Sequence, residues 1–374
     1  MDSEDRLKIA DFDYHLPTEL IAQEPLPERD KSRLMVLNRS TNHIEHRHFQ
    51  EIIDYFRPGD VIVINDSRVI PARIKGQKVK TGGNVELLLL EQLNPGHWRV
   101  LVGGRRLQHG SMIHLFDRNQ QTTNITAEVI NVLDGPVREV KFSRPIIDEL
   151  MDIGHTPLPP YIRKPIENPD RYQTIYARPP GSAAAPTAGL HFTSEILLSL
   201  REMGVLIETI TLHIGLDTFK PISTEFIDDH DIHSEWVTLS PEAARRINEA
   251  KLTGGRIWAT GTTTVRALET AALRSAGLTG SLSEISSLDR SGHSLNACGW
   301  RPVVAIDGKT DLFIYPGYQF RAVDVLITNF HLPQSSLILL VSAFAGIKTV
   351  ARAYKQAIEN QYRFYSFGDA MLIL

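Results

Sequence analysis

The sequence predicts an α/β protein: a main α/β domain, barrel-like or layered with a mostly parallel sheet, and an inserted small antiparallel β-barrel domain. Helical and strand-like patterns alternate beyond residue 190, which is typical of a parallel sheet with helices outside. Residues 61–150 instead carry short apolar runs separated by Gly and Pro, as in small barrels. We therefore expect an α/β domain over 1–60 plus 151–374 and the barrel over 61–150.

The composition is that of an ordered globular protein. Of 374 residues, 42% are hydrophobic and 22% are charged, so the chain has enough apolar surface to form a core. Cys298 is the single cysteine, which excludes a disulfide scaffold. The most apolar stretch, 337–347, is shorter than a membrane-spanning helix, and the acidic N-terminus has no signal-peptide pattern. We expect a cytoplasmic protein without membrane association.

The first 60 residues predict a loop, a strand and a helix. Residues 20–33 are rich in Pro and charged residues, which indicates an ordered surface loop. Residues 34–37 form a short apolar strand. Residues 48–56 have helical spacing, and this helix is expected to end before Pro58 and Gly59.

The strands of the barrel block are predicted from period-two patterns and from turn residues. Gly and Pro occupy most of the gaps, as at Gly82-Gly83 and Gly135-Pro136. The Gly-Gly-Arg-Arg sequence at 103–106 is interpreted as a hairpin turn. The expected strands cover residues 61–64, 72–77, 84–90, 97–102, 111–115, 125–132 and 137–142.

Beyond residue 190, capping residues mark where helices begin. Thr193 can cap a helix that runs to Met203 and ends at Gly204, and Ser240 followed by Pro241 opens the next one. Residues 275–294 contain seven Ser and three Gly and predict a surface loop. The helix that Ser240 opens is expected to run to about residue 252. Further helices are expected over 263–274, 333–344 and 351–362, and strands over 205–214, 256–260 and 323–330.

Charge is unevenly distributed along the chain. The net charge is −4, yet residues 61–150 hold 12 Lys and Arg against 9 Asp and Glu, and residues 68–106 hold eight against two. One interpretation is a footprint for nucleic acid, which is a local feature of a surface. The other is a sheet face whose edges carry protective basic residues. The negative total therefore does not exclude an RNA partner.

Four predicted strand ends are unusually polar, namely residues 181–192, 211–219, 259–264 and 327–336. Binding sites of parallel α/β sheets form at the carboxyl ends of the strands. Small residues there let a ligand approach the backbone, and the helices that follow offer free N–H groups. His191, His213 and His331 lie on three of these segments and can transfer protons near neutral pH.

Each of these features also has a structural interpretation. Any one histidine can be a hydrogen-bonded core residue, and residues 230–236 can be either a surface loop held by Trp236 or a proton-handling group that faces a substrate. The chain has no P-loop and no G-x-G-x-x-G after a strand, which disfavours the common nucleotide enzymes. It has no tight Cys/His or His-x-x-x-His pair, so we predict no metal.

Several longer motifs follow one another along nearly the whole chain. They are residues 14–25 (YHLPTELIAQEP), 29–33 (RDKSR), 65–73 (NDSRVIPAR), 81–83 (TGG), 184–193 (AAPTAGLHFT), 233–235 (HSE), 261–266 (GTTTVR), 315–318 (YPGY), 328–333 (TNFHLP), 362–364 (YRF) and 368–371 (GDAM). Together they closely resemble the S-adenosylmethionine:tRNA ribosyltransferase-isomerase family of queuosine biosynthesis. Two departures are Asp217, where the family usually has Gly, and the Ser-rich segment 275–294, which looks longer than usual.

The resemblance implies a cytoplasmic enzyme with an α/β body and an inserted β-barrel. Its substrates would be S-adenosylmethionine, as co-substrate, and tRNA that carries 7-aminomethyl-7-deazaguanine at the wobble position. The enzyme would move the ribosyl part of S-adenosylmethionine onto the aminomethyl group and isomerise it. The products would be epoxyqueuosine in tRNA, adenine and methionine. No metal is implied, and we expect a monomer.

This reaction requires proton transfers, which the polar strand ends can supply. The sulfonium acidifies the ribose 5′ carbon, so a base can act there, and adenine needs an acid in order to leave. We hypothesise that the proton-transfer set is His191, His213, His233, Glu235 and His331, with base and acid unassigned. S-adenosylmethionine would contact Thr187, Ala188, Gly189, Phe192, Gly215, Gly261, Thr262, Thr263, Arg266, Asn329 and Phe330. Phosphates of tRNA would contact Arg68, Arg73, Lys75, Lys78, Lys80, Arg105 and Arg106.

Within this set, the methionine carboxylate would be held by Arg266 or by the helix N-terminus at Thr262 and Thr263. Phe192, Phe219 or Phe330 could lie against the sulfonium, or else pack in the core. Two other classes of protein stay open. A non-catalytic RNA-binding module explains the basic block but not the histidines, and an α/β-barrel hydrolase leaves the basic block unexplained.

Overall fold

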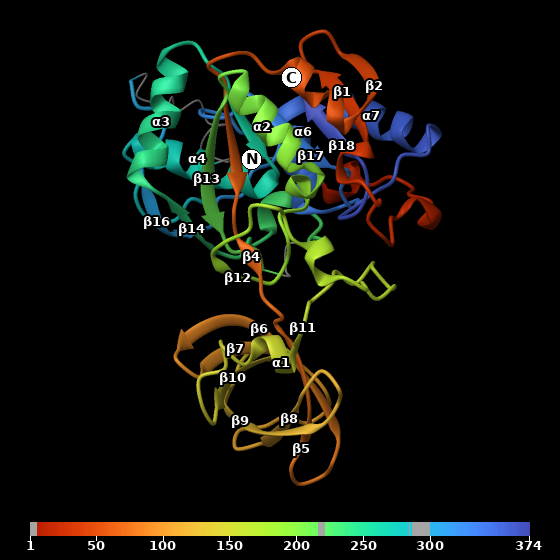
Figure 1. The fold of residues 1–374 in the computed structure, drawn as a ribbon, viewed down its shortest axis with the longest axis vertical. Coiled ribbons are helices and arrows are strands. Elements are labelled where there is room, and N and C mark those ends of the chain that lie inside the picture. Colours follow the sequence, from red (N-terminus) through yellow and green to blue (C-terminus); the bar gives the residue numbers. More distant parts are fainter. Residues whose placement is uncertain (1–5, 216–220, 284, 286–299) are drawn as a thin grey trace. The chain divides into compact units, whose positions relative to one another are not determined.

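The computed structural model describes residues 6–215, 221–283, 285 and 300–374. Asp217, Phe219 and most of the Ser-rich segment lie outside these residues. The chain forms two compact units (Figure 1). The first comprises Met1–Arg68, Pro160–Pro179 and Ala185–Leu374, and the second comprises Val69–Pro159 and Pro180–Ala184.

The first unit is built on a nine-stranded mixed sheet in the order β16-β14-β13-β3-β15-β17-β18-β1-β2. Strands β13, β3, β15 and β17 are parallel neighbours at its centre, and antiparallel pairs occur toward both edges. The α/β prediction is confirmed. The strands are β1 (Arg33–Asn38), β2 (His43–His48), β3 (Val61–Asn65), β13 (Leu206–Leu212), β14 (Glu235–Leu239), β15 (Ile257–Thr260), β16 (Ile306–Thr310), β17 (Val325–Asn329) and β18 (Ala370–Ile373).

Helices follow two of the four central strands, β15 and β17, and two further helices start at the predicted capping residues. The side chains of Thr193 and Ser240 accept hydrogen bonds from the N–H groups of Ile196 and Ala243. The α-helices are α2 (Ser194–Glu202), α3 (Pro241–Leu252), α4 (Thr262–Ser275), α6 (Ser336–Ala345) and α7 (Ile347–Glu359). The short 3-10 helices are Ile9–Phe12, Thr18–Leu20, Arg29–Lys31, Phe49–Tyr55, Pro169–Tyr172, Thr187–His191 and Ile227–Asp229.

No single described helix is long and apolar enough to cross a membrane. Only α6 and α7 taken together pass that test, and they are bent by 114° relative to each other.

One face of the nine-stranded sheet is covered by α2 and by the 3-10 helix Phe49–Tyr55. Ile196 and Leu200 of α2 join Ile62, Trp258 and Ile327 of the sheet in one buried cluster. The other face receives α4, which packs on β3, β15 and β17. Both faces of the central strands are therefore buried, as in α/β proteins generally.

Strand β3 was expected in the barrel, as the first strand of the period-two block, but it belongs to the nine-stranded sheet. It pairs in parallel with β13 and β15, and all five of its residues, Val61–Asn65, are buried. A short apolar run that is buried on both faces looks the same in either kind of sheet, which explains the wrong placement.

The second unit is a six-stranded antiparallel barrel, as predicted. Its strand order is β5-β6-β7-β10-β9-β8, and β5 pairs with β8 to close it. Gly76 permits that closure, because a Cβ there would lie 2.4 Å from the His114 carbonyl oxygen. The strands are β5 (Arg73–Lys78), β6 (Asn84–Asn94), β7 (His97–Gly103), β8 (Met112–Phe116), β9 (Thr122–Val132) and β10 (Val137–Phe142). The remaining elements are β4 (Arg68–Val69), α1 (Leu150–Ile153), β11 (Gly154–His155) and β12 (Pro180–Ser182).

Candidate active site

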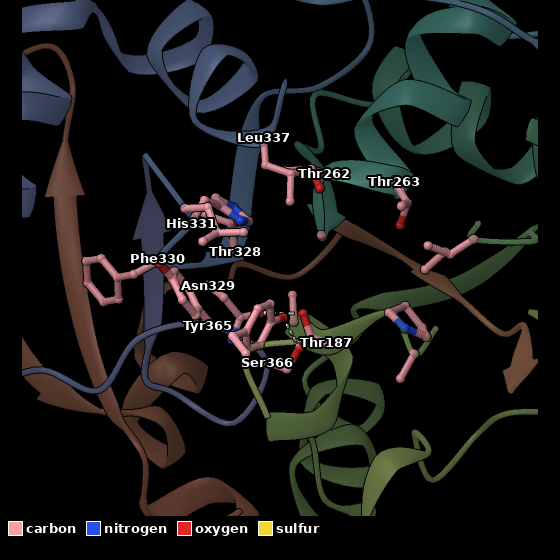
Figure 2. A pocket seen from close by; sticks show the side chains of 17 residues that line it. Thr187, Thr262, Thr263, Thr328, Asn329, Phe330, His331, Leu337, Tyr365 and Ser366 are labelled. Atoms are coloured by element: carbon pink, nitrogen blue, oxygen red, sulfur yellow. Dashed lines mark hydrogen bonds between the residues drawn. The ribbon is translucent and has the colours of Figure 1, made fainter. Parts of the chain in front are cut away.

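A pocket opens in the first unit at the carboxyl ends of β15 and β17 (Figure 2). Its empty volume is about 570 Å³, including open solvent at its mouth. All four polar strand ends singled out in the sequence contribute to this strand-end pocket. Ile214 lines the pocket from the segment 211–219. The predicted site residues that line it come from the other three segments and are Thr187, Ala188, Gly261, Thr262, Thr263, Asn329, Phe330 and His331.

Two helices begin at the wall of this pocket. Gly261 precedes α4 with φ +90° and ψ 153°, a conformation that is essentially restricted to glycine. Helix α6 begins at Ser336, where the Ser335 hydroxyl accepts a hydrogen bond from the Ile338 N–H at 3.4 Å. The free N–H groups at these helix starts give this wall a positive potential.

His191 is tied to the pocket through a chain of hydrogen bonds. The Thr187 hydroxyl donates to Asn329 Oδ1 at 3.0 Å, so Asn329 Nδ2 faces His191 Nε2 at 3.2 Å. Nε2 therefore accepts, and Nδ1 carries the hydrogen toward the Ser32 hydroxyl at 2.8 Å. Burial lowers the pKa of His191 to about 4. His191 is thus a neutral imidazole with both nitrogens occupied.

His331 is the only member of the hypothesised proton-transfer set that lines the strand-end pocket. Its Nε2 lies 2.7 Å from the Thr328 hydroxyl, and its backbone N–H donates to the Tyr354 hydroxyl at 3.0 Å. Burial lowers the pKa of His331 to about 3. The imidazole is consequently neutral across the physiological pH range.

Glu235 and Arg266 form a buried ion pair beside the pocket. One Glu235 carboxylate oxygen accepts from Arg266 Nη1, and the other accepts from the Gly215 N–H at 3.1 Å. Arg266 Nε donates to the Leu312 carbonyl at 3.1 Å. Arg266 Nη2 is buried and has no hydrogen-bond partner among the described residues.

Arg266 lines a second cavity of the first unit, with an empty volume of about 940 Å³ including open solvent. This Arg266 cavity also contains His230 and His233. It shares Thr262, Thr263 and Leu337 with the strand-end pocket, so the two cavities are neighbours on either side of these residues. His233 therefore lies in the adjoining cavity rather than in the strand-end pocket.

His213 lines neither of these two cavities. Its Nδ1 is buried without a hydrogen-bond partner in the described part of the chain. Burial lowers its pKa, while the negative charge of Asp66 acts in the opposite direction. His213 thus lies outside both cavities, although its backbone N–H donates to the carbonyl of Trp236, the neighbour of Glu235, at 3.2 Å.

Three residues that were predicted to contact S-adenosylmethionine serve packing instead, and of these only Phe330 lines the strand-end pocket. Phe192 is fully buried in the core cluster, and Phe330 packs its ring on Tyr354, Tyr362 and Phe364, pointing away from Thr187 in Figure 2. Gly189 serves close packing, because a Cβ there would lie 2.1 Å from the Tyr176 hydroxyl.

Two tyrosines of the pocket wall were missed by sequence reasoning. The rings of Tyr161 and Tyr365 lie 4.6 Å apart, and the Tyr161 hydroxyl is 2.7 Å from the Ser366 hydroxyl. Tyr365 directly follows the motif at 362–364, and this position in the sequence could have identified it as a candidate site residue. Tyr161 lies in a connector that gave none.

The basic residues proposed to contact tRNA divide between the two units. Arg68 belongs to the first, and the other six belong to the barrel. Arg73 Nε lies 3.6 Å from a Glu86 carboxylate oxygen, and Lys78 Nζ donates to the backbone carbonyl of Arg105. The exposed members of the set are Arg68, Lys75, Lys80, Arg105 and Arg106.

Comparison with known proteins places these features in a family context. A family model described as queuosine biosynthesis protein matches residues 9–373. Proteins named S-adenosylmethionine:tRNA ribosyltransferase-isomerase from Desulforamulus reducens and Caldanaerobacter subterraneus are 46% and 48% identical to this chain, over 98% of it and 100% of their own length. A similar solved structure is the crystal structure of S-adenosylmethionine tRNA ribosyltransferase from Thermotoga maritima, whose sequence is 37% identical to this chain. The match covers 97% of this chain and 100% of the Thermotoga maritima chain, with a TM-score of 0.52.

A metal site is not evident in the described part of the molecule. Among the described residues, no group of three or more His, Cys, Asp or Glu side chains is arranged to hold a metal ion.

Proposed function

The chain belongs to the queuosine biosynthesis protein family, and on this premise we propose that it is an S-adenosylmethionine:tRNA ribosyltransferase-isomerase. It transfers and isomerises the ribosyl moiety of S-adenosylmethionine onto 7-aminomethyl-7-deazaguanine at the wobble position of tRNA. The products are epoxyqueuosine-tRNA, adenine and methionine. The full-length match to relatives that bear this name is the observation that carries the proposal.

The strand-end pocket is our candidate for the place where the ribosyl group reacts. His331, Thr187 and Asn329 converge there with the start of α4. The ribose carbon next to the sulfonium and the ammonium form of the tRNA aminomethyl group must both lose a proton, so the site needs a group that can accept one. Because His331 is the member of the proton-transfer set that lines this pocket, we assign it as the general base that acts on the acidified ribose carbon.

The Arg266 cavity is our candidate for the methionine part of S-adenosylmethionine. Arg266 Nη2 is a buried donor without a partner in the described structure, and a carboxylate would satisfy it. The starts of α4 and α6 at Thr262 and Ser336 line the same cavity and favour a negative charge. Glu235 acts as a positioning residue, because its bond to Nη1 fixes the guanidinium.

His191 is proposed as a positioning residue as well. Both of its nitrogens are engaged, and it reaches the pocket through Asn329 and Thr187. We propose that the active form is a monomer. Because the substrate is a tRNA, we place the reaction in the cytoplasm, without a membrane partner.

Adenine release tests the proposed function. The full chain is incubated with S-adenosylmethionine and with tRNA that carries 7-aminomethyl-7-deazaguanine, and free adenine is measured. Release should require both substrates and should not occur with tRNA that lacks the aminomethyl group. An RNA-binding module would release no adenine, and a small-molecule hydrolase would act without tRNA.

A further inference from the structure

Two arginines from distant segments lie together at a small cavity behind the strand-end pocket. Arg29 and Arg171 line this Arg29 cavity, whose empty volume is about 320 Å³ including open solvent. Ser32 and His191 also line it, and Ser366 lines both this cavity and the strand-end pocket. The two cavities are therefore adjacent within the first unit.

Among the described residues, no carboxylate forms an ion pair with either arginine; both guanidinium groups bond to backbone carbonyls. Arg29 donates to the backbone carbonyls of Leu190 and Asp170, each at 3.1 Å. Arg171 donates to the carbonyls of Pro27, at 3.0 Å, and Leu26. Carbonyl oxygens satisfy donors but carry no net charge, so neither guanidinium has a paired carboxylate in the described part of the chain, and Asp170 acts on Arg29 only through its charge.

A third arginine adds to the same positive region. Arg363 Nη2 donates to the Glu24 carbonyl, next to the carbonyls that hold Arg171. Arg363 Nη1 and Arg171 Nε are both buried without hydrogen-bond partners among the described residues. The nearby carboxylate of Asp369 accepts backbone N–H groups, including that of Arg363 at 2.8 Å, rather than a guanidinium.

Electrostatic repulsion is evident at Arg29. Burial, and after it the charge of Arg171, lower its pKa, while Asp170 acts in the opposite direction. His191 is neutral and adds no charge to this region. Two half-buried cations that repel each other are stabilised when an anion binds between them.

We propose that Arg29 and Arg171 bind a phosphate of the tRNA backbone beside the nucleotide that is modified. The proposal rests on the proposed function and adds a tRNA contact in the α/β unit to those expected in the barrel. Guanidinium groups bind phosphate oxygens through paired donors. A base that enters the strand-end pocket brings its own backbone phosphate close to the adjoining cavity, whereas the carboxylate of S-adenosylmethionine has a donor in Arg266.

The test measures tRNA binding by Arg29→Gln and Arg171→Gln as a function of salt concentration. Each substitution should weaken binding by about tenfold at low salt. Each should also reduce the slope of log K against log salt by about 0.7–0.9, the value for one lost phosphate contact. The KM for S-adenosylmethionine should stay unchanged.

Two control variants separate phosphate binding from a role in holding the loop. Arg171→Lys keeps the charge and should retain the salt slope. Arg274 also donates to two backbone carbonyls, those of Leu278 and Gly280, but it lines none of these cavities, so Arg274→Gln should leave tRNA binding unchanged. Circular dichroism and thermal unfolding verify that each variant is folded.

Several results would overturn the proposal. Unchanged salt slopes in folded Arg29→Gln and Arg171→Gln would assign these residues to loop structure alone. A rise in the KM for S-adenosylmethionine with unaltered tRNA binding would identify the anion as the methionine carboxylate. If the wild type releases adenine while either result is obtained, this inference fails and the proposed function stands; if the wild type releases none, the proposed function itself fails.

Discussion

The histidines show most clearly what individual residues contribute. His191 and His331 are both buried and neutral, yet only His331 lines the strand-end pocket. The sequence places them on equivalent strand ends and cannot separate their roles. The difference arises from Ser32 and Asn329, which occupy both nitrogens of His191 and lie far from it in the chain.

His331→Ala should reduce the rate of adenine release by about 10²–10⁴-fold at saturating substrates, the usual contribution of a general base. The binding of tRNA should change little. His43 is exposed on β2, so His43→Ala serves as the matched control and should keep wild-type turnover. Near-wild-type turnover by His331→Ala would remove it from the proton-transfer set.

Arg266→Lys should raise the KM for S-adenosylmethionine by about tenfold, because lysine lacks the second donor arm that Nη2 provides. Arg266→Met should in addition destabilise the fold by about 3–5 kcal/mol, since the buried charge of Glu235 would lose its compensating guanidinium. Substrate kinetics and thermal unfolding measure the two effects. An unchanged KM in Arg266→Lys would contradict the proposed carboxylate contact.

The pH dependence of stability should report on His191. Its pKa is about 4 in the folded protein and about 6.5 when unfolded, so the unfolded state binds the proton first as the pH falls. The stability contributed by the neutral imidazole is complete above pH 6.5 and is lost progressively toward pH 4. Denaturant unfolding of wild type and His191→Gln at pH 7 and pH 4.5 should show a smaller loss in the variant. Parallel losses would show that His191 does not titrate in this way.

At the scale of elements, helix starts shape the pocket. Ser335 caps α6, which begins at the pocket wall, and Ser240 caps α3, which does not; both act through their hydroxyl groups. Ser335→Ala and Ser240→Ala should each cost about 1 kcal/mol of stability. Only Ser335→Ala should also raise the KM for S-adenosylmethionine, by several-fold. Equal kinetics in the two variants would mean that the start of α6 does not contribute to the site.

Elements with local signals were predicted well, and those fixed by long-range pairing were not. The caps at Thr193 and Ser240 can be identified from neighbouring residues alone. The strand β18 has no such signal, because it is inserted between β17 and β1 and pairs with residues over 300 positions away. The position of β3 failed for the same reason, since both of its neighbours, β13 and β15, come much later in the chain.

For the whole molecule, tRNA binding is expected to depend on both units. In the barrel, Lys75, Lys80 and Arg105 are exposed, and replacing all three by Gln should weaken tRNA binding and lower its salt dependence. The KM for S-adenosylmethionine should not change, because its proposed contacts all lie in the first unit. An unchanged salt slope would leave the barrel without the expected phosphate contacts. The segregation of charge could be predicted from sequence, but the Arg29 cavity could not, since it joins Arg29, Arg171 and residues 366–368, which are far apart in the chain.

The fate of the ribosyl carbons tests the central claim most directly. The full chain is incubated with S-adenosylmethionine labelled with ¹³C in its ribose and with tRNA that carries 7-aminomethyl-7-deazaguanine, and the tRNA nucleosides are analysed by mass spectrometry. We predict that epoxyqueuosine appears with all of its transferred ribosyl carbons labelled and in equal amount to released adenine. Adenine release without label in the tRNA, or tRNA that stays unmodified, would contradict the account.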